Sequence, residues 1–313
     1  MLGYVLRRLL AAIPVLAIVA VLVFLMLRLT PGDPAAVIAG DNASSEQIAQ
    51  VRQQLGLDQP LLVQFLIWIG NLLKGNLGES FFFKKSIGEL ILGRIEPTLS
   101  LAAATMLIAV CVAIPLGVVA AYRHGSWLDR IVMGVSVLGF SVPVFVIGYG
   151  MIYVFSITLG WFPVQGYQPL SGGLGGYLHR LVLPSVTLSV VYIALIARMT
   201  RASVLEVLNE DYIRTARAKG QVERKILFRH ALKNAAVPIV TVVGIGIALL
   251  IGGVVVTESV FAIPGLGRLT VDAVLARDYP TIQALILLFS GVYVLINLLI
   301  DLSYSLFDPR IRH

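Results

Sequence analysis

The chain has 313 residues, of which 58% are hydrophobic and 13% are charged, and its mean hydropathy is +0.90. An ordinary soluble domain carries roughly one quarter charged residues, so this composition excludes a chain whose surface is mostly solvated by water. The net charge of +7 is distributed as in a membrane protein with basic loops, and the aromatic and basic clusters of nucleic-acid-binding proteins are absent. The sequence therefore predicts an all-α polytopic membrane protein that has the lipid bilayer as a partner and binds no nucleic acid.

Six stretches are apolar enough to cross a bilayer core, which is about 30 Å thick and requires roughly 20 residues for each helical span. They predict six transmembrane helices at Leu9–Leu29, Thr98–Tyr122, Ile131–Leu159, Leu181–Ala197, Ala235–Thr257 and Thr281–Tyr304. The first resembles a signal peptide, but no small-residue cleavage site directly follows it, so we interpret it as an uncleaved span. The third is long enough to tilt or bend.

These spans divide the chain into an N-terminal end with the first span (1–30), an external helical cap (31–97) and a core of five further spans (98–313). In the cap, Ser44 and Gln47 form a capping-box pattern, and Gly56 ends the helical periodicity that follows. The apolar stretch Leu61–Leu73 is only about 13 residues long, too short to cross. We expect it to form a short helix on the outer membrane surface that ends at Gly75.

The distribution of positive charge predicts the orientation. Nine basic residues lie between Arg198 and Lys233, and further arginines lie near both chain ends, including Arg310 and Arg312. Because basic loops stay on the cytoplasmic side, the loop 198–234 and both termini are expected to be cytoplasmic. The single Cys111 excludes a disulfide within the chain.

A short helix, roughly Glu210–Lys219, is expected within this loop. Asn209 can cap its start, Glu210 and Asp211 complement the positive end of its dipole, and Lys219 with Gly220 provides a favourable end. One face of the helix would carry Tyr212, Thr215, Ala216 and Lys219, and another would carry Arg214 and Arg217.

A second, amphipathic helix would follow it. It would turn Ile226, Leu227 and Ala231 toward the bilayer and Arg224, Lys225 and Arg229 toward water, until Asn234 and Pro238 open the next span. By composition alone, nine basic residues can equally well serve only to fix topology.

The run Asp211–Gly220 resembles the coupling loop of ATP-binding-cassette (ABC) importer permeases, in the form of the dipeptide and oligopeptide permease family. Arg214, Thr215 and Ala216 occupy the places of the general Glu-Ala-Ala pattern, so the Glu and the first Ala are absent, and Pro238 comes later than in sugar permeases. Both departures are features of the peptide branch. Further segments that resemble this branch are Leu29–Pro34, Leu55–Asp58, Glu258–Phe261, Pro264–Gly267, Arg277–Pro280 and Asp308–Arg310.

The resemblance implies a type I ABC importer permease fold in the bacterial inner membrane, most like the first (B-type) subunit of a dipeptide permease. It assigns ATPase coupling to Tyr212, Arg214, Thr215, Ala216, Arg217, Ala218, Lys219 and Gly220. The chain itself would be no enzyme and would hold no cofactor, because ATP and magnesium would bind to two cytoplasmic ATPase subunits. An external substrate-binding protein and a second permease subunit complete the expected complex, with a related chain favoured over a second copy. Gly220→Asp is expected to abolish coupled transport without affecting insertion.

No catalytic or metal-binding group is predicted. The four histidines lie in or beside loops, and Gly88–Ile95 has the glycine spacing of a phosphate loop but lacks its Lys and its Ser or Thr. Polar residues that could line a substrate pathway are Ser141, Tyr192, Glu258 and Asn297, although Ser in a span often bonds its own helix and Glu258 can equally hold the external loop. The main alternative is an ion-coupled secondary transporter, which usually requires ionisable groups near mid-membrane. The cargo stays open among dipeptides, longer peptides, glutathione, opines and nickel chelates.

Overall fold

The computed structural model describes the chain apart from residues 1, 30–34, 37–42, 55 and 308–313. The described residues fold mostly into helices, and the only β-pairing among them is one isolated antiparallel bridge between Glu79 and Ser86. They form two compact units. The first, which we call the core unit, comprises 1–5, 96–268 and 295–313, and the second, the cap unit, comprises 6–95 and 269–294. The all-α prediction is confirmed.

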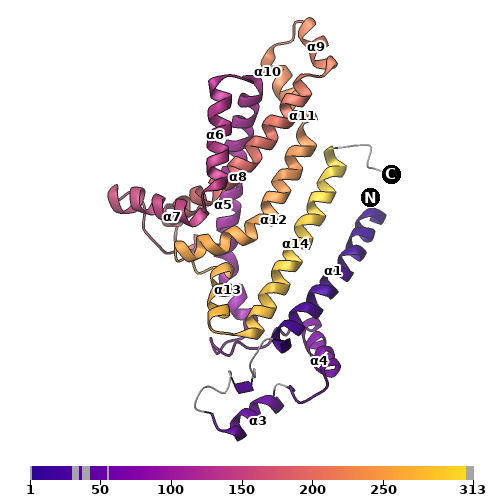
Figure 1. The fold of residues 1–313 in the computed structure, drawn as a ribbon, viewed down its shortest axis with the longest axis vertical. Coiled ribbons are helices and arrows are strands. Elements are labelled where there is room, and N and C mark those ends of the chain that lie inside the picture. Colours follow the sequence, from indigo (N-terminus) through magenta and orange to yellow (C-terminus); the bar gives the residue numbers. More distant parts are fainter. Residues whose placement is uncertain (1, 30–34, 37–42, 55, 308–313) are drawn as a thin grey trace. The chain divides into compact units, whose positions relative to one another are not determined.

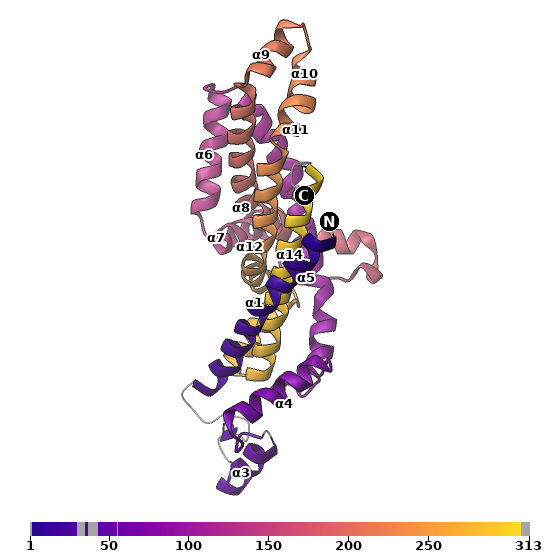
Figure 2. The same cartoon turned by 90° about the vertical axis from the view of Figure 1, so that its right-hand side faces the viewer.

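The core unit contains most of the long helices. Its elements in chain order are α5 (Ile87–Tyr122, which begins in the cap unit), α6 (Trp127–Ser141), α7 (Val144–Met151), η1 (Ile152–Thr158), η2 (Leu170–Gly172), α8 (Leu174–Leu208), α9 (Asp211–Ala218), α10 (Glu223–Lys225), η3 (Ile226–Ala231), α11 (Leu232–Asn234) and α12 (Ala236–Val260). Within this unit α8 packs between α6 and α12 (Figures 1 and 2). The cap unit contains most of α1 (Leu2–Leu29), α3 (Ser45–Gln54) and α4 (Leu61–Leu73), and α13 (Leu266–Leu275) and α14 (Tyr279–Phe307) are shared between the units.

Among the described residues, four helices are long and apolar enough to cross a membrane: Ile87–Tyr122, Leu174–Leu208, Ala236–Val260 and Tyr279–Leu302. A fifth span results if the bent pair Trp127–Ser141 and Val144–Thr158 is counted as one. The first predicted span is helical within α1, but its described apolar part, Leu10–Met26, is shorter than these four. Four to five of the six predicted spans are thus present as such.

The third predicted span is bent by 102° between α6 and α7. Val142 adopts an extended conformation, with φ −85° and ψ 126°, directly before Pro143. The proline ring disfavours helical geometry in the residue that precedes it, so the sequence at this point forces the chain to change direction. The expectation of a bend is confirmed.

Three predicted span ends lie well inside longer helices. The helix α5 begins at Ile87 instead of Thr98 and runs through Pro97. The helix α8 begins at Leu174 instead of Leu181 and continues past Ala197 to Leu208. The early part of α5 buries Ile87 and Ile91 one turn apart. Tertiary packing therefore stabilises a helical segment that has no unbroken apolar run to mark it in the sequence.

The cap unit confirms the predicted local signals. The Ser44 N–H donates to Oε1 of Gln47 at 2.8 Å, and the Gln47 N–H donates to the Ser44 hydroxyl at 3.2 Å, which is a reciprocal capping box. Gly56 and Gly75 follow α3 and α4 with φ of +63° and +78°, a conformation that glycine adopts without steric cost.

The helix α4 spans Leu61–Leu73 as predicted and packs against α1 through aromatic side chains. The ring centroids of Phe24 and Phe65 lie 5.1 Å apart and those of Phe24 and Trp68 lie 5.7 Å apart. The opposite face of α4 exposes Val63 and Ile67. An apolar face that no other described element covers suits a helix in contact with lipid.

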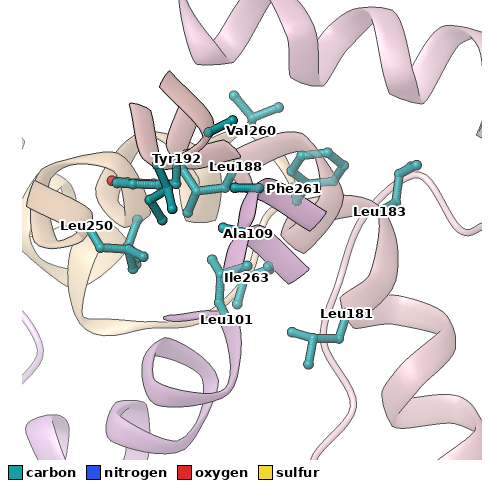
Figure 3. Packing of buried hydrophobic residues seen from close by; sticks show 14 of the residues in the cluster. Leu101, Ala109, Leu181, Leu183, Leu188, Tyr192, Leu250, Val260, Phe261 and Ile263 are labelled. Atoms are coloured by element: carbon teal, nitrogen blue, oxygen red, sulfur yellow. The ribbon is translucent and has the colours of Figure 1, made fainter. Parts of the chain in front are cut away.

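The main hydrophobic cluster of the core unit lies where α5, α8 and α12 meet. Figure 3 shows Tyr192 beside Leu188, with Leu250 and Phe261 in the same cluster. Small residues allow the helices to approach closely: a Cβ atom on Gly117 would lie 2.6 Å from Cβ of Thr200, and one on Gly244 would lie 2.4 Å from the Ile300 side chain. Close packing at small residues is the usual basis of helix association in lipid.

Candidate functional site

The connection between α8 and α12, residues 209–235, is folded into two short helical segments. The first is α9, and the second runs without a break from Glu223 to Asn234 through α10, η3 and α11. Both extend beyond the end of α8, at the same end of the core unit as the turn between α5 and α6 (Figures 1 and 2). We call residues 209–235 the basic connection.

The limits of α9 agree with the predicted helix to within one residue at each end, but its cap does not. Glu210, with φ −69° and ψ 146°, is the residue before the helix, whereas Asn209 ends α8 and donates its side-chain N–H to Leu205 O at 3.0 Å. At the other end Gly220 has φ +74°, and the Gln221 N–H donates to Ala216 O at 3.2 Å. This is the glycine-terminated helix end expected from the sequence.

The inner face of α9 consists of Ile213 and Ala216, which are 0% and 8% exposed. They belong to a second hydrophobic cluster with Val118 of α5, Val204 of α8 and Ile226 of η3. Ala216 shares a face with Tyr212, Thr215 and Lys219 by helical spacing, but these three side chains are exposed. Ala216 itself is packed inside the chain and anchors α9 to the helix ends below it.

The second segment contains a π-helical turn, Ile226–Ala231. In a regular α-helix two residues five positions apart point about 140° away from each other. The i→i+5 hydrogen bonds of a π-turn bring them to one face, and both Ile226 and Ala231 are 0% exposed. The prediction that these two residues face the bilayer is therefore wrong, because both pack on the protein's own helices.

Two polar contacts tie the segments together on either side of this apolar centre. The Asn234 side-chain N–H donates to the Tyr212 hydroxyl at 2.7 Å, and His230 Nε2 lies 2.9 Å from Oε1 of Gln221. One contact holds the start of α9 and the other holds its exit turn. The basic connection is thus a preorganised unit with a fixed relation between its two helical segments.

The outer surface of the basic connection is positively charged. Arg214 pairs with Asp211 at 3.1 Å and Arg217 pairs with Glu223 at 2.9 Å, both at exposed positions. Several other cations make no ion pair with any residue that the structure describes: Lys219, Arg224, Lys225, Arg229 and Lys233. Of the predicted coupling residues, all but Ala216 are therefore available to a partner on this surface.

An ion pair that no sequence motif predicts fixes the same end of the core unit. Arg201 of α8 donates from Nε to Oδ1 and from Nη2 to Oδ2 of Asp129, the latter at 2.8 Å. Asp129 is 3% exposed and also accepts from the Gly125 N–H at 3.0 Å. Two parallel bonds from a guanidinium are geometrically specific, so they hold the α5–α6 turn against α8. Asp129 and Arg201 are 72 residues apart in the chain, so no local sequence pattern predicts their contact.

Glu258 lies at the other end of α12 and is fully buried. Its Oε1 accepts from the Thr98 hydroxyl at 2.6 Å and its Oε2 accepts from the Arg268 N–H at 2.9 Å. A Cβ atom on Gly265 would lie 2.0 Å from Oε1, so glycine at this position leaves the room that the carboxylate occupies. This geometry supports the expectation that Glu258 holds the loop after α12, and it leaves the carboxylate no exposed surface for a substrate.

The other three predicted pathway residues lie on different helices and each has a different environment. Tyr192 is 4% exposed within the main hydrophobic cluster. Ser141 donates to Val137 O at 2.8 Å, one turn back in its own helix, which is the common behaviour of serine in a span. Asn297 is half-buried on α14. A pathway role for Ser141, Tyr192 and Asn297 stays a prediction.

Two further kinds of site were considered from the sequence, a phosphate-binding loop and a metal site. The glycine pattern 88–95 lies inside α5 and therefore forms no phosphate-binding loop. In the part of the chain that the structure describes, no group of three or more His, Cys, Asp or Glu side chains is placed to hold a metal ion. Of the resembling segments, 30–34, Leu55 and 308–310 lie outside the described residues.

Comparison with known proteins agrees with this architecture. Residues 113–313 match the family model of the binding-protein-dependent transport system inner membrane component, and residues 1–102 match the model of its N-terminal part. The chain belongs to this family of membrane transport components.

Particular relatives cover the whole chain. A probable peptide ABC transporter permease protein of Sinorhizobium fredii is 55% identical over 99% of each chain, and a glutathione transport system permease protein of Salmonella choleraesuis is 47% identical over 100% of each. Among solved structures, an inward-facing MetNI methionine ABC transporter aligns with a TM-score of 0.59 at 20% identity, covering 70% of this chain and 96% of that one. The last comparison shows the type I importer permease fold.

Proposed function

We propose that this chain is the membrane-spanning permease subunit of an ATP-driven, binding-protein-dependent importer of di- and oligopeptides. The observation that carries the proposal is the basic connection: α9 is anchored through Ile213 and Ala216 and presents Arg214, Arg217 and Lys219 outward. A rigid helix with an exposed basic face can transmit the movement of a docked partner to α5, α8 and α12, to which it is packed. Family membership supports the same function.

The chain has no nucleotide site in our proposal, so two cytoplasmic ATPase subunits would bind ATP and magnesium and would dock on Tyr212–Gly220. Closure of the ATPase pair on ATP would turn the permease outward-open, and hydrolysis would reset it. An external binding protein would deliver the cargo. A second, related permease subunit would complete the pathway, since one chain has few helices with which to enclose it.

The proposed topology has six spans in the bacterial inner membrane, with both termini cytoplasmic. α1 would be the first span, α6 with α7 and η1 the third, and α4 would lie on the outer membrane surface as part of the external cap 31–97. The length of α1, 28 residues, supports this topology, since about 20 residues suffice to cross.

The first experiment is co-purification of the assembled importer through a tag on this chain, compared with a variant in which Arg214–Gly220 is replaced by a neutral Gly/Ser linker. The ATPase subunits are expected to be retained by the intact chain and lost from the variant. Retention by neither would favour an ion-coupled carrier. Retention by both would show that docking does not depend on α9.

Peptides are the cargo that the Sinorhizobium fredii relative's name indicates, and glutathione is a second candidate because a relative that is 47% identical is named for it. Binding-protein-dependent uptake of a labelled dipeptide, a labelled longer peptide and labelled glutathione by reconstituted vesicles separates these cargoes. Uptake of glutathione alone would contradict the peptide assignment.

A further inference from the structure

A tight turn in the cap unit, residues 80–85, precedes α5, and we call it the cap turn. The Lys84 N–H donates to Ser80 O at 3.1 Å, and the Phe83 N–H donates to the Ser80 hydroxyl oxygen at 2.9 Å. The same hydroxyl donates to Oδ2 of Asp278, which is 2% exposed and directly precedes α14. The cap turn is therefore closed by its own hydrogen bonds and is fixed to the start of α14 by a buried carboxylate.

The side chains that the cap turn presents at the surface are aromatic and basic. Phe82 is 60% exposed, and its ring packs edge to face on Phe83, with the ring centroids 4.9 Å apart. Lys84 and Lys85 follow directly and are exposed. Arg277, beside the carboxylate that fixes the turn, is also exposed. None of these three cations makes an ion pair with any residue that the structure describes.

Two of the three cations adopt a backbone conformation that their residue type disfavours. The angle φ is +54° at Lys84 and +53° at Arg277, in the left-handed region that only glycine adopts without steric cost. Neither side chain forms a hydrogen bond or an ion pair within the part of the chain that the structure describes, so no internal contact explains why a long basic side chain is placed there. Backbone strain of this kind clusters at functional sites, which makes both cations candidates for contact with a partner.

The charge of this surface is positive. The cap turn itself carries two lysines and no acid, and Arg277 adds a third cation. Of the neighbouring acids, Glu79 lies at the base of the turn, where it pairs with Ser86, and Asp272 is paired with Arg94 at 3.8 Å. An anionic partner therefore complements the cap turn.

The depth of the cap turn in the membrane follows from α1 and α14. The Gln283 side-chain N–H of α14 donates to Val23 O of α1 at 2.9 Å, so these two residues lie at the same depth. The described apolar part of α1 ends at Met26, about 4.5 Å outward of Val23, and Asp278 lies about 7.5 Å outward of Gln283, at 1.5 Å per residue. The cap turn thus lies roughly 3 Å outside the apolar core, within a headgroup layer about 5–8 Å thick.

We propose that the cap turn and Arg277 bind the phosphate-bearing headgroup of an anionic phospholipid in the outer leaflet. Phe82 enters the layer between headgroups and acyl chains, and Lys84, Lys85 and Arg277 contact the phosphate. Aromatic rings at the membrane interface and cations beside anionic headgroups are the usual basis of such anchoring. The proposal rests on the proposed topology, in which the cap is external, and adds a lipid partner that the proposed function does not require.

The test is photocrosslinking from position 82 in the assembled importer, purified through a tag on this chain and placed in discs of phosphatidylcholine with a minor share of phosphatidylglycerol. Adducts with phosphatidylglycerol are expected to exceed the share of this lipid in the disc. One cation beside an anionic surface contributes about a fivefold preference, so the excess should fall about fivefold in Arg277→Gln and further in Lys84→Gln with Lys85→Gln. Lys84→Gly should lower the excess without lowering thermal stability, because glycine adopts φ of +54° without strain.

Two controls accompany this measurement. Arg52→Gln removes an exposed cation from α3, outside the cap turn, and should leave the excess unchanged. A crosslinking residue at position 292, exposed on α14, should give adducts in proportion to the disc composition. Adducts from position 82 of the intact chain in that same proportion would overturn the proposal, as would adducts with an added external binding protein in place of lipid.

The topology is tested separately by Lys85→Cys in a chain that also carries Cys111→Ala, with a thiol reagent that does not cross the membrane. Labelling from the outside is expected. Labelling from the outside without an excess of phosphatidylglycerol adducts would overturn the lipid-binding surface and leave the proposed topology standing. Labelling from the cytoplasmic side alone would contradict both.

Discussion

Thr98 of α5 and Glu258 of α12, 160 residues apart in the chain, are joined by a hydrogen bond of 2.6 Å between the threonine hydroxyl and the buried carboxylate. The same hydroxyl oxygen accepts from the Leu266 N–H at 2.8 Å, and the carboxylate accepts from the Arg268 N–H. Two side chains thus satisfy the first free N–H groups of α13. This arrangement holds the loop after α12 to α5.

Glu258→Ala is expected to lower the free energy of unfolding by at least about 2 kcal/mol, because it leaves buried donors on Thr98 and Arg268 without their acceptor. The measurement is the thermal unfolding of the detergent-solubilised chain. Ser259→Ala is the control, since Ser259 is exposed and its hydroxyl donates to Val255 O of its own helix. Equal stability of the two variants would show that Glu258 has no structural role.

Asp129→Ala is expected to destabilise the core unit by about 3–5 kcal/mol, the usual cost of removing one partner from a buried ion pair. The reason is that the Arg201 guanidinium, only 18% exposed, would lose both of its carboxylate bonds. Asp211→Ala removes the partner of Arg214 at a fully accessible surface position and is expected to have no measurable effect. Equal effects of the two changes would contradict the assigned difference in burial.

Gly220→Val is expected to impair ATP-driven uptake more strongly than Gly220→Asn. A Cβ atom at this position meets no other atom within 4 Å, so space is not the constraint, whereas φ is +74°. Asparagine tolerates this conformation much better than a β-branched residue does. Uptake and membrane insertion are measured for both variants, and equally impaired transport would mean that chain conformation at Gly220 is not what coupling requires.

Ile213→Ala is expected to release α9 from the helix ends while the rest of the core unit stays folded. Removing a fully buried isoleucine side chain usually costs about 2–5 kcal/mol, which exceeds what a helix of 8 residues supplies by itself. Hydrogen exchange should therefore accelerate in α9 and not in α12. The control is Thr215→Ala at an exposed position, for which exchange in α9 should stay slow.

Local sequence signals correctly predicted those features that depend on residues only a few positions apart. The Ser44 and Gln47 side chains cap a helix through atoms three residues apart, and Pro143 bends the third span through its immediate neighbour. Helix ends at Thr98 and Ala197 were wrong because the actual continuations, Ile87–Pro97 and Arg198–Leu208, are stabilised by packing on other elements. Hydropathy indicates whether a segment is suited to lipid or to water. It carries no information about packing against elements that are distant in the sequence.

The sequence by itself determined the membrane class, four to five of the six predicted spans, the family resemblance and the place of a short basic helix before Gly220. Only the tertiary structure decided that Ala216 faces inward with Ile213, that a π-turn leaves Phe228 outside, and that Glu258 and Asp129 are buried beside Thr98 and Arg201. The physical reason is the range of the interactions. Composition and helical periodicity follow from neighbours within a few residues, whereas burial and ion pairing join groups that the chain brings together only on folding.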